Sequence, residues 1–186
     1  MLTLRLTHKV IKESQLPNAS FLILPEHGDV MEDWYVNLFM HEKRKHLLFT
    51  HAGSLVSFVA AGVYRQDVKD LEKIFKREFM KFLEFYKFDE QDIAMLQSAL
   101  NETRFAKTMD RRVTRLMADC IRHYKWYVSD TPHHKEYSPE DYALYQTNRV
   151  PLKSFKYASA IEVFHNMVTG LKSFHHIPGH RAVGLN

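Results

Sequence analysis

Hydrophobic and polar residues alternate most regularly over residues 33–61, where three apolar or aromatic runs follow one another. Residues 34–40 and 46–52 are separated by the polar tetrapeptide 42–45, and the dipeptide Gly53-Ser54 precedes the third run. Short polar connections between such runs are typical of β-hairpins, and a two-residue turn that begins with glycine suits type II′ geometry. The pattern therefore predicts two consecutive hairpins.

The register of these hairpins can be derived from the same pattern. If residues 41 and 46 pair, Asn37 lies opposite Thr50, and the second hairpin sets Thr50 opposite Ser57. Because side chains alternate across a strand, these three residues form a polar row on one face of the sheet. The row has two interpretations: a partly solvated or internally hydrogen-bonded surface, or a weak binding site for a small polar ligand.

The opposite face is apolar except for His51. A single histidine on an apolar face is most simply a neutral core residue with one hydrogen bond, and the alternative is a titrating catalytic group. In an enzyme that used the row to orient its substrate, His51 or Asp33 would supply acid–base function. The predicted register works against this combination, because it puts His51 and the row on opposite faces.

The remaining segments predict a strand-first, helix-later chain. We expect strands over 2–6, 21–24 and 102–109, a loop over 25–32, and a short helix after Thr7. Longer helices are expected over 67–86 with Asp67 as N-cap, over 89–100, after Asp110 to about 128, from Ser138-Pro139, and over 157–171 up to Gly170. This order indicates an α+β fold, an antiparallel sheet built around the two hairpins and covered by several helices. Residues 1–172 would form a single domain, followed by a flexible tail over 173–186.

Composition fits a globular protein. Hydrophobic residues make up 45% of the 186 residues and aromatic residues 13%, which argues against extensive disorder. The single cysteine, Cys120, excludes an intramolecular disulfide framework and sits at an apolar position, so we expect a buried, reduced thiol. No signal peptide and no run of roughly 18 apolar residues is present, so we expect a cytoplasmic location and no membrane partner.

The segment KTMDRR offers the clearest candidate for an anion site. Arg111 and Arg112 would lie in the first turn of a helix, where the helix dipole disfavours cations unless an anion or carboxylates compensate. With Lys107 and Thr108 they could hold a phosphate, since helix N-termini and arginine forks both bind phosphates. The alternative is that Asp110 and acidic neighbours absorb the charge. Further along the helix, the spacing predicts an ion pair between Arg115 and Asp119.

The same residues give only weak support for a nucleic-acid partner. The formal net charge is +4, and basic residues are spread along the chain among acidic ones.

The histidines His133-His134, and His175-His176 with His180, lack the ligand spacing of a structural or catalytic zinc site, so we expect no metal and no cofactor.

No nucleophile, phosphate-loop or dinucleotide motif occurs in the chain. The sequence therefore favours a binding or accessory module over an enzyme. A small-molecule enzyme that uses the polar row, and a protein-interaction partner without a ligand, remain alternatives. Self-association into a homo-oligomer stays open.

Four segments together resemble a known family: LTLRLT (2–7), DWYVNLF (33–39), LLFTHAGSLVSF (47–58) and AKTMDRRV (106–113). In their order and spacing they are similar to a family of small bacterial proteins described only as a domain of unknown function. The resemblance implies a compact α+β domain and carries no activity. Its segments coincide with the polar row and with the basic helix start.

Overall fold

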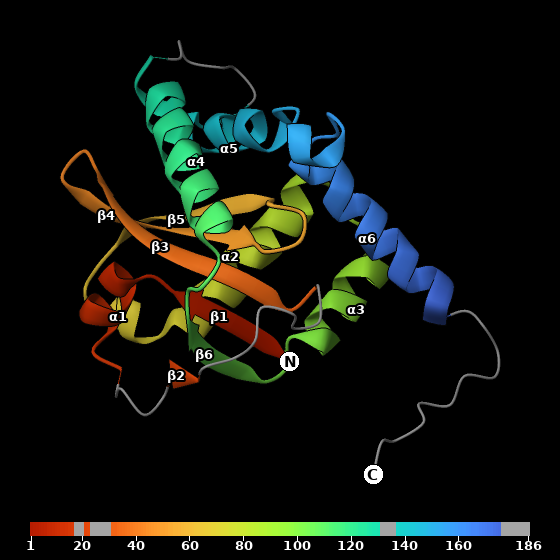
Figure 1. Cartoon of the computed structure of the whole chain (residues 1–186), viewed down its shortest axis with the longest axis horizontal. Coiled ribbons are helices and arrows are strands. Elements are labelled where there is room, and N and C mark those ends of the chain that lie inside the picture. The colour runs from red at the N-terminus through yellow and green to blue at the C-terminus, as the bar shows by residue number, and fades with distance from the viewer. Residues whose placement is uncertain (17–20, 23–30, 131–136, 176–186) are drawn as a thin grey trace.

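The computed structural model describes residues 1–16, 21–22, 31–130 and 137–175. Six strands of these residues form one sheet in the order β2-β6-β1-β3-β4-β5 (Figure 1). The strands are β1 (Leu2–Leu6), β2 (Phe21–Leu22), β3 (Asp33–His41), β4 (Arg44–His51), β5 (Ser57–Val63) and β6 (Thr103–Lys107).

The two predicted hairpins are present, with a correction to the first register. β3 pairs antiparallel with β4 and β4 with β5, and Thr50 lies opposite Ser57 as predicted. Asn37, however, lies opposite Leu48 rather than Thr50. The predicted four-residue loop is in fact a two-residue turn at Glu42 and Lys43, both with positive φ (47° and 61°). A two-residue turn with positive φ at both positions fits the twist of the flanking strands. Such turns usually have the sequence Asn-Gly, which is absent here.

The register error is two residues, so the assignment of side chains to faces is unchanged. The second turn also differs from the prediction. Leu55 (φ 64°), and neither Gly53 nor Ser54, adopts the left-handed conformation, and its N–H donates to the His51 carbonyl (2.9 Å). The Ser54 N–H donates to His51 Nδ1 (3.1 Å), so side-chain hydrogen bonding within the loop replaces the expected II′ turn.

The sheet is mixed, which corrects the prediction of an antiparallel sheet. β1 is parallel to both β3 and β6, and β2 is parallel to β6. Parallel pairing requires a crossover, and the chain between β1 and β3 includes α1 (His8–Ser14). β1 therefore lies inside the sheet, and all of its residues are buried, including Thr3 and Arg5.

Helices cover both faces of the sheet (Figure 1). α2 (Leu71–Phe85), α3 (Glu90–Ala99) and α6 (Ala160–His175) pack with α1 on the face that carries Trp34. There Trp34 contacts a group of aromatic rings from β5, α2 and α6, namely Phe58, Phe75, Phe79 and Phe164. α4 (Arg111–Asp130) and α5 (Pro139–Arg149) cover the other face.

Several predicted helix ends are confirmed, but the starts of α2 and α6 and the end of α6 are wrong. The side chains of Asp89, Asp110 and Ser138 accept N–H groups at the starts of α3, α4 and α5. α2, however, is capped by Asp70, because Asp67 instead accepts the Tyr64 N–H (2.8 Å) and begins a separate 3₁₀ turn, η2 (Asp67–Lys69).

α6 begins at Ala160, because Tyr157 has a positive φ (70°) in the turn before it. Gly170 does not end α6, which continues to His175, so residues 173–175 of the predicted tail are helical. A glycine inside a helix costs about 1 kcal/mol, a penalty that tertiary packing can offset. The rest of that tail (176–186), most of the predicted 25–32 loop, and residues 131–136 lie outside the described residues.

Candidate functional site

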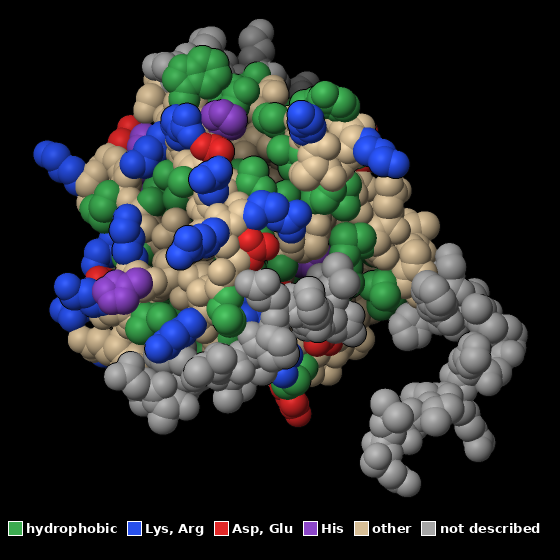
Figure 2. All heavy atoms as spheres, viewed as in Figure 1, with side chains coloured by type: hydrophobic (Ala, Val, Ile, Leu, Met, Phe, Trp, Pro, Cys, Tyr) green, Lys and Arg blue, Asp and Glu red, His purple; other side chains and the backbone are tan. Residues whose placement is uncertain are grey.

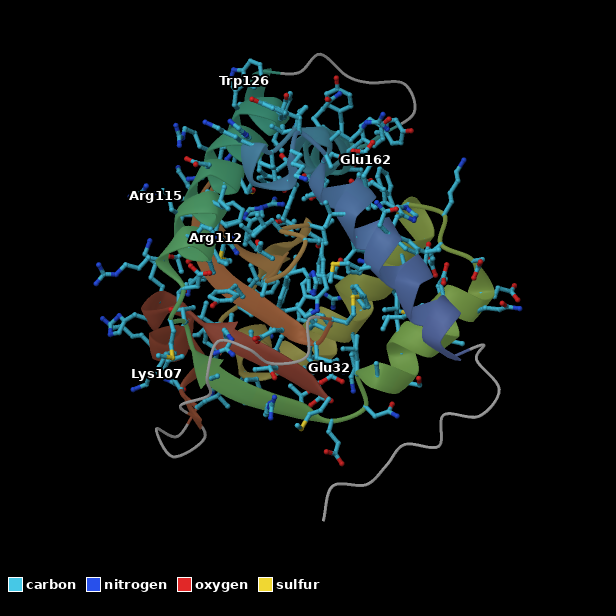
Figure 3. The ribbon with its side chains drawn as sticks, turned by 45° about the vertical axis from the view of Figure 1, so that its right-hand side comes forward. Glu32, Lys107, Arg112, Arg115, Trp126 and Glu162 are labelled. Carbon is cyan, nitrogen blue, oxygen red and sulfur yellow. The ribbon has the colours of Figure 1, made fainter. Side chains whose placement is uncertain are left out.

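The start of α4 is the most basic helix end in the described chain, and Asp110 shapes it. The Asp110 carboxylate accepts the N–H groups of Arg112 (2.6 Å) and Val113 (3.3 Å), which is a standard N-cap. Val113, Met117 and Tyr124 bury one side of the helix against the sheet. The spacing of these apolar residues turns the arginines outward to solvent, as Figure 3 shows for Arg115.

A hollow of about 440 Å³ lies beside this helix start. It also includes Ser154 from η3 (Lys153–Phe155), a 3₁₀ turn about forty residues later in the chain. We call it the arginine hollow. Its lining residues are Arg111, Arg112, Arg115, Leu116 and Ser154. The hollow therefore joins two separate segments, and its positive charge comes entirely from one helix.

The arginines of the hollow have few acidic partners among the described residues. Arg112 Nε lies 3.8 Å from an Asp110 carboxylate oxygen, with the Arg112 side chain largely exposed. The predicted pair between Arg115 and Asp119 is absent, because Asp119 pairs with Arg122 instead. Within the described chain, neither Arg111 nor Arg115 forms an ion pair.

A second hollow on α2 provides a useful contrast. It is about 550 Å³ and lined by Lys73, Lys76 and Arg77 together with the acidic residues Asp70 and Glu72. Lys76 pairs with Glu72 at 2.6 Å, and Arg77 with the neighbouring Glu78 at 2.7 Å. Two carboxylates in the lining of the α2 hollow thus offset part of its positive charge, whereas no carboxylate is among the described lining residues of the arginine hollow.

Lys107 and Thr108 are placed close to α4 in sequence but outside the described lining of the hollow. Lys107 ends β6 and is exposed, and in Figure 3 it lies beyond the start of α4. The Thr108 N–H donates to the Leu6 carbonyl (3.3 Å) and anchors the connection. Of the four predicted anion-binding residues, the fold brings Arg111 and Arg112 together and adds Arg115.

The polar row is only partly assembled. Thr50 and Ser57 are fully buried, and their hydroxyl oxygens are 2.8 Å apart. Asn148 of α5 covers Ser57, exchanging two 2.8 Å hydrogen bonds with its backbone. The Cys120 thiol of α4 also hydrogen-bonds Ser57, and burial raises its pKa to about 11, which makes it a poor nucleophile.

The other two residues proposed for that site lie elsewhere. Asn37 accepts a hydrogen bond from the Thr7 hydroxyl (3.2 Å), so Thr7 does not use its side chain to cap α1. His51 is buried on the opposite face, 5.0 Å from the ring of Trp34. His51 Nδ1 accepts the Ser54 N–H (3.1 Å), so this ring nitrogen is occupied within the loop.

A buried polar cluster between the sheet and α4 escaped the sequence reasoning. Arg5 Nε donates to the Asp33 carboxylate at 2.7 Å, and the two side chains are 1% and 6% exposed. Next to them the Tyr35 hydroxyl accepts the Asp110 N–H (3.3 Å), and burial raises the pKa of Tyr35. Asp33, considered above as an acid–base group, is therefore half of a structural ion pair. The sequence feature that could have indicated this cluster is Arg5, a charged residue within the alternating strand β1.

A histidine–tyrosine cluster lies at the other end of α4. The rings of His41 and His46 are 5.9 Å apart, and both contact Tyr124. His46 is buried. Burial lowers the pKa of His46 and raises that of Tyr124. The Tyr124 hydroxyl and His41 Nε2 are buried without hydrogen-bond partners.

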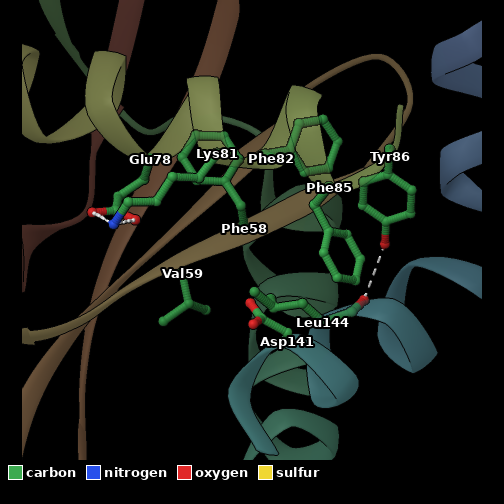
Figure 4. Close-up of a pocket in the computed structure, with 9 residues that line it drawn as sticks. All are labelled: Phe58, Val59, Glu78, Lys81, Phe82, Phe85, Tyr86, Asp141 and Leu144. Carbon is green, nitrogen blue, oxygen red and sulfur yellow. Dashed lines mark hydrogen bonds and ion pairs between the residues drawn. The ribbon is translucent and has the colours of Figure 1, made fainter. Parts of the chain in front are cut away.

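A small cavity of about 70 Å³ lies between α2, β5 and α5 (Figure 4). Phe82, Phe85 and Leu144 make it largely apolar, and Glu78 at its edge is paired with Lys81. Its volume would hold about two waters at liquid density. It is too small for a metabolite.

The described residues hold neither a metal site nor a membrane-spanning helix. Among them, no group of three or more histidine, cysteine or acidic side chains could hold a metal ion. The predicted histidine pairs fall largely outside that part of the chain. No helix in it combines the length and apolar composition needed to cross a bilayer.

A search among curated proteins found no match. The family model for DUF6933, a domain of unknown function, matches residues 3–163, which include the whole polar cluster, α4 and η3. The match spans most of the sequence and agrees with the resemblance carried by its N-terminal segments. The chain therefore belongs to the DUF6933 family.

Proposed function

We propose that this protein is a non-enzymatic binding module that holds a phosphate-bearing ligand in the arginine hollow. One observation carries the proposal: Arg111, Arg112 and Arg115 line a single hollow with no described carboxylate among its walls. Guanidinium groups bind phosphate oxygens bidentately, and three of them around one space suit a group with two or more negative charges.

The helix start contributes less than the arginine side chains. Asp110 already accepts two of the first N–H groups of α4, so part of the dipole is compensated within the protein. A ligand in the hollow would therefore be held mainly by side-chain charge. Ser154 of η3 also lines the hollow and would offer a hydroxyl donor to the ligand. Lys107, exposed at the end of β6, adds longer-range attraction.

Ligand binding to the folded state must raise the thermal midpoint, and the rise grows with ligand concentration over Kd. We expect inorganic phosphate, and pyrophosphate more strongly, to raise the Tm of the wild-type protein at low ionic strength. Arg111→Ala/Arg115→Ala should abolish the rise. Lys76→Ala/Arg77→Ala, which removes two cations from the α2 hollow, is the matched control and should retain it. An equal rise in all three proteins would contradict the proposal.

The two alternatives receive less support. For an enzyme built on the polar row, Thr50 and Ser57 would have to be reached by substrate, yet α4 and α5 cover them. For a protein partner without a ligand, the described chain offers exposed apolar side chains such as Met109 and Tyr157, but nothing that identifies the partner. The free thiol of the half-buried Cys120 fits the cytoplasmic setting that we infer for the module.

A further inference from the structure

The positive charge of this protein is concentrated on α4. The helix holds five basic and two acidic residues, a net charge of +3, against a formal charge of +4 for the whole chain. Four of their side chains share one exposed line along the helix, at spacings of one or two turns. We call this line the exposed stripe; it comprises Arg111, Arg115, Arg122 and Trp126, and of these Arg122 is also paired with Asp119. Since a helix rises 1.5 Å per residue, the stripe is roughly 22 Å long.

Trp126 is the unusual member of the stripe. Its side chain is 56% exposed and rests against Tyr127, with ring centroids 4.8 Å apart. The other tryptophan, Trp34, is completely buried. Figure 3 shows Trp126 at the far end of α4 from Arg112. An exposed indole beside a row of arginines offers a flat apolar surface next to positive charge.

A second basic surface continues from this end of the helix. Lys125 lies over the ring of Phe39 (5.8 Å) in β3, and β3 leads into the turn that ends the first hairpin. Beside that turn, Lys43, Arg44 and Arg65 line a hollow of about 470 Å³. Tyr64, in the same hollow, is 72% exposed. Figure 2 shows Lys and Arg side chains spread over the face that carries α4, with fewer Asp and Glu.

We infer that the phosphate-bearing ligand is a single-stranded nucleic acid, whose backbone follows the arginines of the exposed stripe and one of whose bases stacks on Trp126. This inference rests on the proposed function and specifies its ligand. A row of cations beside exposed aromatic rings is the arrangement by which proteins bind single strands, with charge tracking the backbone and rings stacking on bases.

The composition of the stripe disfavours the other polyanionic partners. A helix that binds in a membrane interface needs a broad apolar face, and the apolar face of α4 is packed against the sheet. An acidic protein segment would pair with the arginines but would leave the indole of Trp126 without a matching flat surface. A duplex stacks its bases internally, so it offers no free base to Trp126.

The test is fluorescence anisotropy with a labelled oligothymidylate of about 15 nucleotides. Three arginine–phosphate contacts predict that log K falls with log salt at a slope of about −2, and Arg115→Ala/Arg122→Ala should reduce the slope to about −0.7. Trp126→Ala should weaken binding by at least about 5-fold, and Trp126→Phe should retain most of the affinity. Arg77→Ala/Lys81→Ala, exposed cations on α2, is the control and should bind like the wild type.

Three results would overturn the inference. The first is that the oligonucleotide does not bind at low salt, and the second is that wild type and Trp126→Ala bind it with equal affinity. The third is that a duplex, polyglutamate or phosphatidylserine vesicles bind more tightly than the single strand. If the oligonucleotide fails while pyrophosphate still raises the Tm through Arg111 and Arg115, only this inference falls. If both fail, the proposed function falls with it.

Discussion

Arg5 and Asp33 form an ion pair buried between the parallel strands β1 and β3, with 2.7 Å between Nε and the carboxylate oxygen. The pair lies on the sheet face that α4 covers, next to Tyr35, whose hydroxyl accepts the N–H of the α4 cap residue Asp110. A chain of polar contacts thus connects the middle of the sheet to the start of the helix that carries the arginine hollow. The pair holds the sheet in the register on which α4 is placed.

We predict that Asp33→Asn destabilises the protein by about 3–5 kcal/mol, because it leaves the Arg5 charge buried without its counter-ion. Urea denaturation measures the loss. Arg5→Met/Asp33→Leu should cost less than either single change, since it removes both charges. Lys76→Ala, which breaks the exposed pair with Glu72, should cost no more than about 0.5 kcal/mol. A small effect of Asp33→Asn would contradict the structural role of the pair.

At the start of α4 we predict opposite effects for the cap and the arginines. Asp110→Ala should cost about 1 kcal/mol, because it removes the acceptor of two N–H groups. Arg111→Ala and Arg112→Ala should leave stability in plain buffer within about 0.5 kcal/mol of wild type, or raise it slightly, since cations are unfavourable at a helix start. Equilibrium unfolding separates these cases. A loss above about 2 kcal/mol for either arginine would show that it serves a structural carboxylate.

Cys120 should be almost unreactive in the folded protein. Burial raises its pKa from 9.0 to about 11, which lowers the thiolate fraction at pH 8 by ~100-fold. Alkylation by iodoacetamide at that pH should therefore be at least that much slower in native protein than in urea-unfolded protein. Native and unfolded rates within a factor of about three would mean that the thiol is accessible and ordinary.

His46 predicts a loss of stability on mild acidification. Burial, assisted by the nearby His41 and Arg44 charges, lowers the pKa of His46 below its usual 6.5. As the pH falls, the unfolded chain therefore takes up a proton before the folded chain does. Stability is fully present above about pH 7 and declines as the pH drops toward the folded pKa.

Urea midpoints measured between pH 7.5 and about 5 test this sign. His46→Phe, which keeps a ring stacked on Phe39, should flatten part of the pH dependence. His8→Gln, at an exposed position in α1, is the control. Should His46→Phe retain the full pH dependence of the wild type, the loss on acidification would come from other groups.

The sequence predicted those features that depend on neighbours along the chain. The alternation of residues 33–61 assigned side chains to the correct faces of both hairpins, and local composition identified Asp110 and Ser138 as helix starts. The turn at Glu42-Lys43 could not be recognised, because its two left-handed residues have none of the usual signals. Because the turn was not recognised, the predicted register of the first hairpin was wrong, and Asn37 was placed opposite Thr50 instead of Leu48.

The features that depend on distant contacts were missed. Parallel pairing on both sides of β1 brings Arg5 beside Asp33, and no local pattern announces that a strand of five residues lies inside the sheet. The arginine hollow needs Ser154, which only the folded chain brings to α4. Likewise, side-chain geometry decides whether Asp119 pairs with Arg115 or with Arg122. Asp119 pairs with Arg122, so Arg115 is available for a ligand.

The central claim is that the arginine hollow binds phosphate groups, and an NMR titration of isotope-labelled protein with pyrophosphate tests it most directly. We predict saturable shifts of the Arg111, Arg112 and Arg115 side-chain Nε–H signals and of the Ser154 amide. The Lys73, Lys76 and Arg77 amides of the α2 hollow should stay unchanged. No shifts at the start of α4, or equal shifts at both hollows, would contradict the claim.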